Sequence, residues 1–287
     1  MKSNERYGHT KMKQYNIKEE ILENILRDLQ KDHYLSDKAR LSKRTAQETD
    51  SIVYVDDYVF QDAAGAYRTD EVINDILLFL RRNQLKFEGQ VPNRLEYQYI
   101  WDLIRYNFIV PWKSFTNTME KLVYVLSCIK KPFQSIAVGI NCGYTFGFLI
   151  APLFWQNNIG QQTFGIEKNQ RLADIARRNI SHLFKDDRVS VICQDALAAL
   201  DNFQPNSFDL TFLDTRTDFR ILEKLYEKIK PGGWLLMHNA SDIHFKDTIQ
   251  PYLNFVRDPR YFCASYLFPI DAKGLELSVK KGDTKSL

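Results

Sequence analysis

From about residue 114 onward, short runs of β-branched and aromatic residues alternate with longer segments whose apolar residues have helical spacing. The short runs predict strands and the longer segments predict helices. A chain that alternates in this way folds into a mostly parallel sheet covered by helices on both faces. The expected strands are 135–140, 162–169, 188–196, 207–215 and 234–240, and the expected helices are 119–131, 147–156, 170–184 and 220–229, the last closed by the "KPGG" sequence.

The last part of this region has a different pattern. Residues 249–258 predict a helix, and residues 261–281 predict two strands joined by a turn near Asp271 to Gly274. Two strands that follow each other with a short turn form an antiparallel hairpin. We therefore expect an α/β fold with a doubly wound, mostly parallel seven-stranded sheet and a C-terminal antiparallel hairpin at its edge.

The N-terminal hundred residues are mainly helical in pattern. Residues 16–32 and 69–84 predict amphipathic helices, the second with Thr69 or Asp70 as N-cap, and residues 95–112 predict a third helix that Pro111 ends. Residues 51–67 predict a short strand or an ordered loop that breaks at Gly65. The sequence thus divides into a helical region, 1–110, and an α/β region, 111–287.

The charges of the chain nearly cancel, with 39 basic and 36 acidic residues and a net charge of +3. This balance gives no global footprint of a nucleic-acid-binding protein, and the densest basic run, residues 38–44, is typical of a solvated surface. No apolar segment reaches the roughly 20 residues that span a bilayer, and the N-terminus has no apolar signal region. We expect a cytoplasmic protein without a membrane partner.

The four cysteines also exclude two kinds of site. They are far apart in the sequence and form no CxxC pair: Cys128, Cys142, Cys193 and Cys263. This spacing argues against a disulfide framework and against a zinc knuckle.

A glycine-rich segment, "AVGINCGYTFG", follows the first expected strand and contains Gly139, Gly143 and Gly147. A strand, a glycine turn and a helix place backbone N–H groups at the carboxyl end of a sheet, where open α/β sheets bind ligands. A turn used only for packing is the alternative. The glycine spacing differs from the G-x-G-x-x-G pattern, which argues against a dinucleotide.

Three acidic residues come at or just after the ends of the next expected strands. Glu167 lies 20 residues after Gly147, and Asp195 and Asp214 follow the third and fourth strands. A carboxylate at the position of Glu167 can accept hydrogen bonds from both ribose hydroxyls, and Asp195 is placed to reach an adenine edge. The pattern favours a ligand with one nucleoside and a charged amino-acid tail.

Five motifs in this order resemble those of a known family. They are "VGINCGYT", "GIEKN", "FDLTFLDTRTDF", "KIKPGGWLLMHNA" and the terminal "DPRYFCASYLFPIDAKGLELSVKK". From about residue 110 to 282 the chain resembles class I S-adenosylmethionine-dependent methyltransferases of the catechol and caffeoyl-CoA O-methyltransferase type. This resemblance implies a Rossmann-like methyltransferase fold and S-adenosylmethionine as the cofactor.

The resemblance also implies roles for single residues. The family would bind the methionine part of the cofactor around the glycine turn, the ribose at Glu167 and the adenine at Asp195. Its metal-dependent members hold a divalent ion with two carboxylates and an asparagine. The positions implied for the methionine part are Gly139, Tyr144 and Thr145, and Gly143 and Asp214 are further cofactor-binding positions. Those implied for the metal are Asp214, His238 and Asn239.

Three positions depart from the family pattern. His238 replaces the second metal carboxylate, Thr217 replaces a lysine near the acceptor, and Ala137 replaces a glutamate that opens the glycine motif. Magnesium and calcium prefer oxygen ligands, whereas imidazole suits manganese, iron, nickel or zinc, so the metal has either changed or been lost. His238 is open to three interpretations: a metal ligand, a general base near neutral pH, or a structural residue. His244 is a further candidate in the same loop.

The implied activity is O-methylation of a small-molecule acceptor, with Asp214 and His238 as the candidate catalytic residues. The region 1–110 would supply a lid over the acceptor pocket or a homodimer contact. Tyr106, Trp112 and Lys113 are candidate acceptor contacts, and packing between helices is their alternative role. Two other hypotheses are methylation of an RNA nucleoside and a cofactor-binding protein without transferase activity.

Overall fold

The computed structural model describes most of the chain after residue 64. The expected helix 16–32 lies outside the described residues, as do Trp112, Lys113, Thr217, His244 and all but two residues of the basic run 38–44. The described ranges are 41–42, 54–55, 65–85, 87, 89–92, 94–111, 117–154, 161–185, 187–215, 218–240, 246–268 and 274–282.

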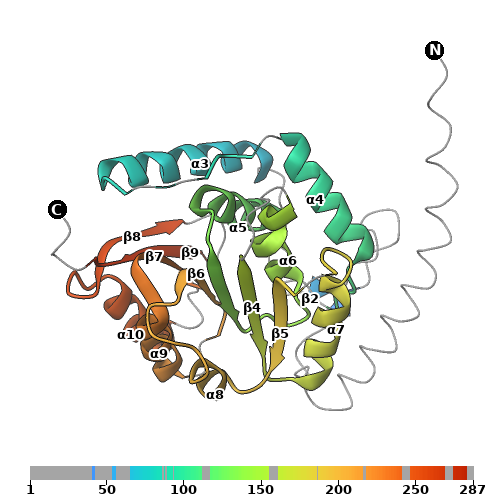
Figure 1. The fold of residues 1–287 in the computed structure, drawn as a ribbon. Helices are drawn as coiled ribbons and strands as arrows, with labels where there is room; N and C mark the ends of the chain where they lie inside the picture. The colour runs from blue at the N-terminus through green and yellow to red at the C-terminus, as the bar shows by residue number, and fades with distance from the viewer. Residues whose placement is uncertain are drawn as a thin grey trace, which may run out of the picture.

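A seven-stranded sheet forms the centre of the molecule, with strand order β5-β4-β3-β6-β7-β9-β8 (Figure 1). The five strands from β5 to β7 are parallel, whereas β9 is antiparallel to both of its neighbours, β7 and β8. This arrangement confirms the predicted sheet with its terminal hairpin. The strands are β3 Gln134–Val138, β4 Gln162–Glu167, β5 Val189–Cys193, β6 Phe208–Leu213, β7 Ile229–His238, β8 Phe262–Phe268 and β9 Leu275–Lys280.

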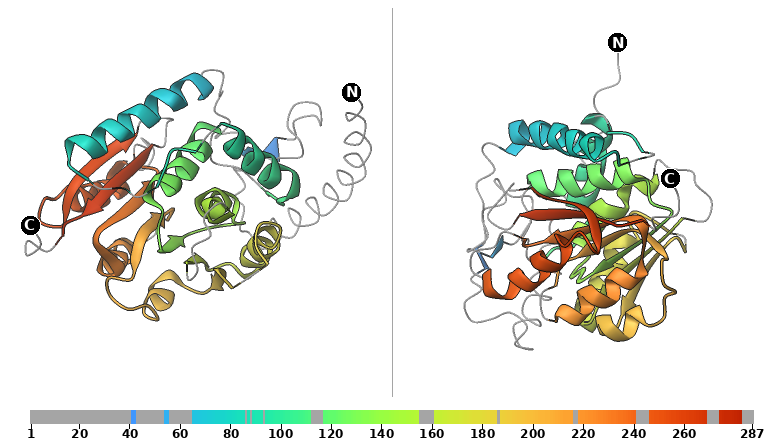
Figure 2. Two further views of the ribbon diagram at one scale, coloured as in Figure 1. Left: turned by 45° about the horizontal axis from the view of Figure 1, so that its top comes forward. Right: turned by 90° about the vertical axis from the view of Figure 1, so that its left-hand side faces the viewer.

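Helices cover both faces of the sheet (Figures 1 and 2). Successive residues of a strand point to opposite faces, so Ala137 of β3 joins one buried cluster while Ile136 and Val138 join the other. The first cluster includes α5 Asn117–Lys130, α6 Tyr144–Ile150 and α7 Gln170–Ile180; the second includes α8 Ala196–Leu200, α9 Phe219–Lys228 and α10 Lys246–Val256.

Two further helices, α3 Gly65–Arg82 and α4 Arg94–Asn107, form an outer layer over the first face (Figure 1). Helix α3 packs on α5 and reaches the hairpin, where the rings of Phe79 and Tyr266 have centroids 5.3 Å apart. Helix α4 packs on α6. The two helices and the sheet therefore share one core. Near them in the sequence, β1 Leu41–Ser42 and β2 Tyr54–Val55 form a small antiparallel pair, which confirms a short strand within 51–67.

Several helix boundaries differ from the predictions. Helix α3 begins at Gly65, so Thr69 and Asp70 lie inside it and neither is its N-cap. Helix α4 ends four residues before Pro111, and the segment between them is held by the buried side chain of Asn179. Helix α6 begins at Tyr144 because Gly143 adopts a left-handed conformation, and it tightens into a 3₁₀ turn, η2 Ala151–Phe154, around Pro152.

Two local predictions also need correction. The "KPGG" sequence belongs to β7 instead of closing a helix: Gly232 has φ +74°, and the register with β6 shifts there. A glycine with positive φ can build a bulge into a strand. The short helix α8 was not predicted, and the Asp195 side chain caps it.

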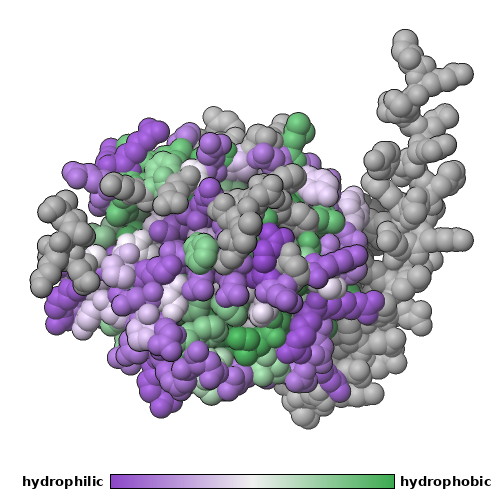
Figure 3. Space-filling view, in the orientation of Figure 1, coloured by the Kyte–Doolittle hydropathy of each residue, from purple (hydrophilic) through white to green (hydrophobic). Residues whose placement is uncertain are grey.

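Hydrophilic residues predominate among the described residues on the face shown in Figure 3. Large apolar side chains also reach the surface, among them Leu95 and Tyr99 on α4. Within the described ranges, we find no helix with the length and apolar character needed to cross a bilayer.

Candidate active site

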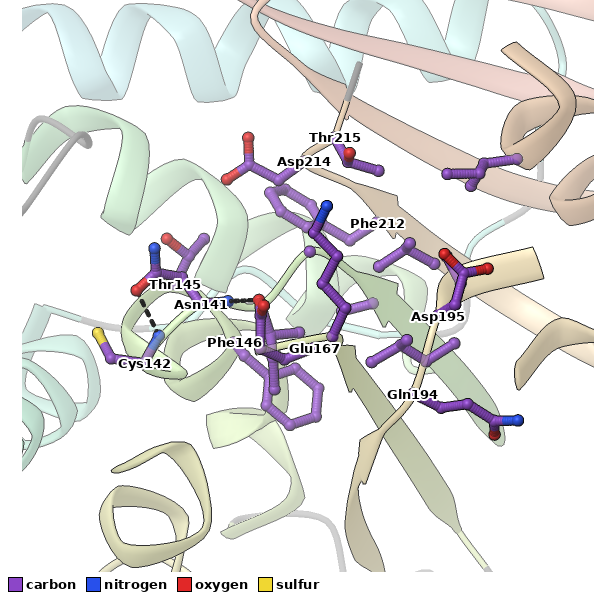
Figure 4. Close-up of a pocket in the computed structure, with 18 of the residues that line it drawn as sticks. Asn141, Cys142, Thr145, Phe146, Glu167, Gln194, Asp195, Phe212, Asp214 and Thr215 are labelled. Atoms are coloured by element: carbon purple, nitrogen blue, oxygen red, sulfur yellow. Dashed lines mark hydrogen bonds between the residues drawn. The ribbon is translucent and has the colours of Figure 1, made fainter. Parts of the chain in front are cut away.

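A cavity of about 360 Å³ opens at the carboxyl ends of β3, β4, β5 and β6 (Figure 4). It brings together residues that are far apart in the sequence, because the carboxyl ends of parallel strands meet at one edge of the sheet. Most of the cofactor residues that the sequence indicated line this cavity: Gly139, Tyr144, Thr145, Glu167, Asp195 and Asp214. Gly143 lies directly beside them as the N-cap of α6.

The three glycines of the turn have two different tasks. Gly139 has φ +82°, and a Cβ atom there would lie 2.7 Å from the carbonyl oxygen of Asp214. Gly143 has φ +79° and packs on Ala176. Gly147 has an ordinary conformation, but a Cβ there would lie 2.8 Å from the Phe108 ring. The first two glycines therefore shape the turn, and the third permits helix packing.

Glu167 connects the end of β4 to the glycine turn. Its Oε2 accepts a hydrogen bond from the Asn141 N–H at 2.9 Å (Figure 4). Its Oε1 accepts one from the Asn169 N–H, also at 2.9 Å. The side chain is buried, and this burial raises the pKa of Glu167 above its ordinary value, while the backbone donors oppose the rise. Each oxygen keeps further acceptor capacity for a ligand hydroxyl.

Asp195, for which the resemblance implies an adenine contact, lines the cavity just after the end of β5. Its Oδ1 accepts the Leu197 N–H at 2.9 Å and so caps α8, and the residue is exposed at the cavity. The adjacent Gln194 and the cation Lys168 also line the cavity and were missed by sequence reasoning. Their one available signal was position, because both lie in the last residues of a predicted core strand and directly follow β4 and β5 in the structure.

Asp214 makes a polar cluster with His238, the last residue of β7, and with Asn239, which follows it. The His238 Nδ1 lies 2.7 Å from the Asp214 Oδ1, and the Asn239 Nδ2 donates to the same oxygen at 3.0 Å. His238 and Asn239 are buried, whereas the Asp214 side chain is 19 % exposed. Among the residues described, Asp214 lines the cavity and the other two do not. His238 and Asn239 thus contact the cavity through Asp214.

The resemblance implied a divalent ion at these three residues, and the donor set can be tested against that expectation. It offers one carboxylate, one imidazole and one amide, and both nitrogens already face the Asp214 Oδ1. Magnesium and calcium require several oxygen ligands. Nor do the described ranges contain a group of three His, Cys, Asp or Glu side chains that could hold a metal. The cluster does not fit magnesium or calcium.

Of the three residues expected to contact the acceptor, the structure describes Tyr106 alone. Tyr106 is half-buried on α4 and is not among the described residues that line the cavity. Trp112 and Lys113 lie outside the described residues. An acceptor role for these three residues therefore stays a prediction.

Residues 136–240 match a family model described as a methyltransferase domain. No curated protein sequence matches the chain. Solved structures do match. A putative O-methyltransferase from Klebsiella pneumoniae has a TM-score of 0.55 at 15% identity, covering 67% of this chain and 92% of that one.

Two similar structures contain the cofactor or its product. The O-methyltransferase from Bacillus cereus, in complex with SAH, has a TM-score of 0.52 at 21% identity and covers 67% of this chain and 93% of that one. The structure of TomG from Streptomyces achromogenes, an O-methyltransferase involved in tomaymycin synthesis, is in complex with SAM. It has a TM-score of 0.52 at 14% identity and covers 71% of this chain and 96% of that one. Residues 136–240 thus match a methyltransferase domain model, and the chain has the Rossmann-like fold of these O-methyltransferase structures.

Proposed function

We propose that this protein transfers a methyl group from S-adenosylmethionine to a hydroxyl group of a small molecule. The observation that carries the proposal is the cavity itself, which joins a left-handed glycine turn to acidic side chains at the ends of β4, β5 and β6. The methyltransferase domain match and the similar structures with bound SAM or SAH support the same cofactor.

The charge of the cavity supports this cofactor over a phosphorylated nucleotide. Among the described residues that line it, three carboxylates, from Glu167, Asp195 and Asp214, stand against one lysine, Lys168. The pyrophosphate of a dinucleotide would be repelled by such a site, whereas a sulfonium and an ammonium group would be attracted. A ligand with an uncharged nucleoside and a cationic tail fits both features.

In this proposal, the parts of the cavity bind different parts of the cofactor. The turn residues Gly139, Gly143, Tyr144 and Thr145 take the methionine part, Glu167 takes the ribose hydroxyls and Asp195 takes the adenine. The backbone N–H groups at the start of α6 can hold the cofactor carboxylate, because they lie at the positive end of a helix.

The chemistry is an in-line displacement. The acceptor oxygen forms a bond to the methyl carbon while the bond from that carbon to sulfur breaks, which leaves S-adenosylhomocysteine and a proton from the hydroxyl group. We assign Asp214 as the acceptor of that proton, because it is the member of its cluster that lines the cavity. His238 and Asn239 hold the carboxylate in one orientation. Alignment of the reacting atoms would supply most of the acceleration.

The cofactor assignment is tested by calorimetric titration with S-adenosylhomocysteine. We expect micromolar binding to the wild type, at least tenfold weaker binding to Glu167→Ala, and unchanged binding to Glu223→Ala, which replaces an exposed glutamate on α9. Absence of binding to the wild type would refute the proposal.

The same preparation tests the metal and the acceptor. We expect no heat from magnesium and full methyl transfer to phenolic acceptors in the presence of a chelator. Binding of manganese or zinc that Asp214→Asn abolishes would instead assign the cluster to a metal. Methyl transfer to RNA alone, with salt-sensitive RNA binding, would contradict the small-molecule acceptor.

A further inference from the structure

Asn179 is a buried polar side chain that joins two distant segments of the chain. It lies near the end of α7 and is 0% exposed. Its Oδ1 accepts the Ile109 N–H at 2.7 Å, and its Nδ2 donates to the carbonyl oxygens of Ile109 and Cys142, both at 2.8 Å. One amide side chain thus uses both of its donor hydrogens and its acceptor oxygen on backbone groups.

The two segments that Asn179 joins have different positions in the molecule. Cys142 belongs to the glycine turn and lines the cavity. Ile109 lies just after α4, a helix of the outer layer. Asn179 and Ile109 are not among the described residues that line the cavity. Asn179 therefore supports the turn without occupying the ligand site.

Packing around Asn179 reinforces the same connection. Gly143 lies against Ala176, one turn earlier on α7, and the Phe108 ring lies against Gly147 of α6. Phe108, Ile109 and Cys142 are all buried. Without the Asn179 amide, three backbone groups in this dry environment would lose a hydrogen-bond partner. The segment after α4 and the glycine turn would have to shift to regain partners.

We propose that Asn179 is a positioning residue that holds the glycine turn in its ligand-binding shape and couples it to the segment after α4. The inference rests on the proposed function for the identity of the ligand. Its consequence is that the outer helical layer contributes to cofactor affinity without contacting the cofactor.

The test compares two core variants that lose stability for different reasons. Asn179→Ala removes the three hydrogen bonds, whereas Leu225→Ala removes a buried side chain from the opposite face of the sheet. At a temperature where both are folded, we expect Asn179→Ala to bind S-adenosylhomocysteine at least tenfold more weakly than the wild type. Leu225→Ala should bind within twofold of it. Equal affinities in the two variants would overturn the proposal.

Hydrogen exchange provides a readout that does not depend on the ligand. In unliganded Asn179→Ala, amide exchange should accelerate at both 104–110 and 137–147, and in Leu225→Ala it should not accelerate there. Unchanged exchange in Asn179→Ala would overturn the positioning role, and this readout needs no ligand. Failure of the wild type to bind S-adenosylhomocysteine would separately refute the proposed function.

The wild type alone can decide the question if Asn179→Ala does not fold. Saturation with S-adenosylhomocysteine should then slow amide exchange at 104–110, although this segment does not line the cavity among the residues described. A ligand that protects 137–147 and leaves 104–110 unchanged would overturn the coupling.

Discussion

Gly139 and Gly232 share a left-handed backbone conformation but differ in their surroundings. Their φ angles are +82° and +74°. A Cβ atom at Gly139 would lie 2.7 Å from the Asp214 carbonyl oxygen, whereas a Cβ at Gly232 would meet no atom within 4 Å. Alanine substitutions at the two glycines therefore separate the free-energy cost of the left-handed backbone conformation from the cost of a steric clash of the added methyl group.

This difference predicts unequal effects of the same substitution. Gly232→Ala should lower the free energy of unfolding by about 1–2 kcal/mol, which is the cost of a left-handed alanine. Gly139→Ala should lower it by about 1–3 kcal/mol more because the methyl group collides with backbone, and it should also weaken S-adenosylhomocysteine binding. Urea denaturation and calorimetry measure both effects. Equal destabilisation by the two variants would contradict the close approach at Gly139.

The residues of the cavity differ in how far the sequence could indicate them. Glu167, Asp195 and Asp214 come at or just after strand ends, and parallel strands bring these positions together. Direct contact between Asp214 and His238 depends on the parallel pairing of β6 with β7. The Asn179 amide gave no sequence signal, because its partners are backbone groups 70 and 37 positions away.

At the scale of elements, Arg257 connects the end of α10 to the hairpin. Its Nε and Nη2 donate to the two carboxylate oxygens of Glu276 on β9, each at 2.9 Å. Glu276 is 1% exposed and also accepts a hydrogen bond from the Ser265 hydroxyl on β8. A buried carboxylate is thus balanced by an arginine that reaches it from the surface.

Loss of this arginine should destabilise the hairpin more than loss of an exposed one. Arg257→Ala leaves a buried carboxylate without its charged partner, and we expect a loss of about 2–3 kcal/mol in unfolding free energy. Arg260→Ala breaks a surface pair with Asp258 and should cause no measurable change. Denaturant titrations of the two variants and the wild type measure these changes in unfolding free energy. A similar small effect for both would show that water replaces the Arg257 contact.

Local sequence rules failed where an element depends on its neighbours. The "KPGG" sequence has the composition of a turn, yet β7 pairs with β6 at Ile229 and again from Trp234 onward, so these four residues form an irregularity inside the strand. Helix α8 is only five residues long, too short for helical periodicity to be visible in the sequence. The long amphipathic helices were predicted because their periodicity spans many residues, and the core strands because each is a short run of β-branched and aromatic residues.

At the scale of the whole molecule, the predicted boundary at residue 110 crosses a shared core. The Tyr97 ring of α4 has centroid distances of 5.7 Å to the Tyr124 ring and 6.5 Å to the Phe148 ring. Ile76, Ile104 and Phe148 belong to the same buried cluster. The outer helices thus cover apolar faces of α5 and α6.

A chain that begins at residue 111 should therefore not fold by itself. Removal of α3 and α4 would expose this apolar surface, and we expect aggregation or a loss of the cooperative thermal transition. Circular dichroism and size-exclusion chromatography, with the full chain as control, measure the outcome. Cooperative unfolding and wild-type ligand affinity in the shortened chain would establish an independent domain.

The position of β9 has a consequence for synthesis on the ribosome. β9 follows β8 in the sequence but lies between β7 and β8 in the sheet. Until β9 emerges, β7 has an unpaired edge and β8 has no partner within the sheet. This side of the sheet therefore cannot form before the nascent chain includes residue 280. A ribosome that pauses before β9 would hold a chain with exposed apolar strand edges, which is a substrate for chaperones and a hazard for aggregation.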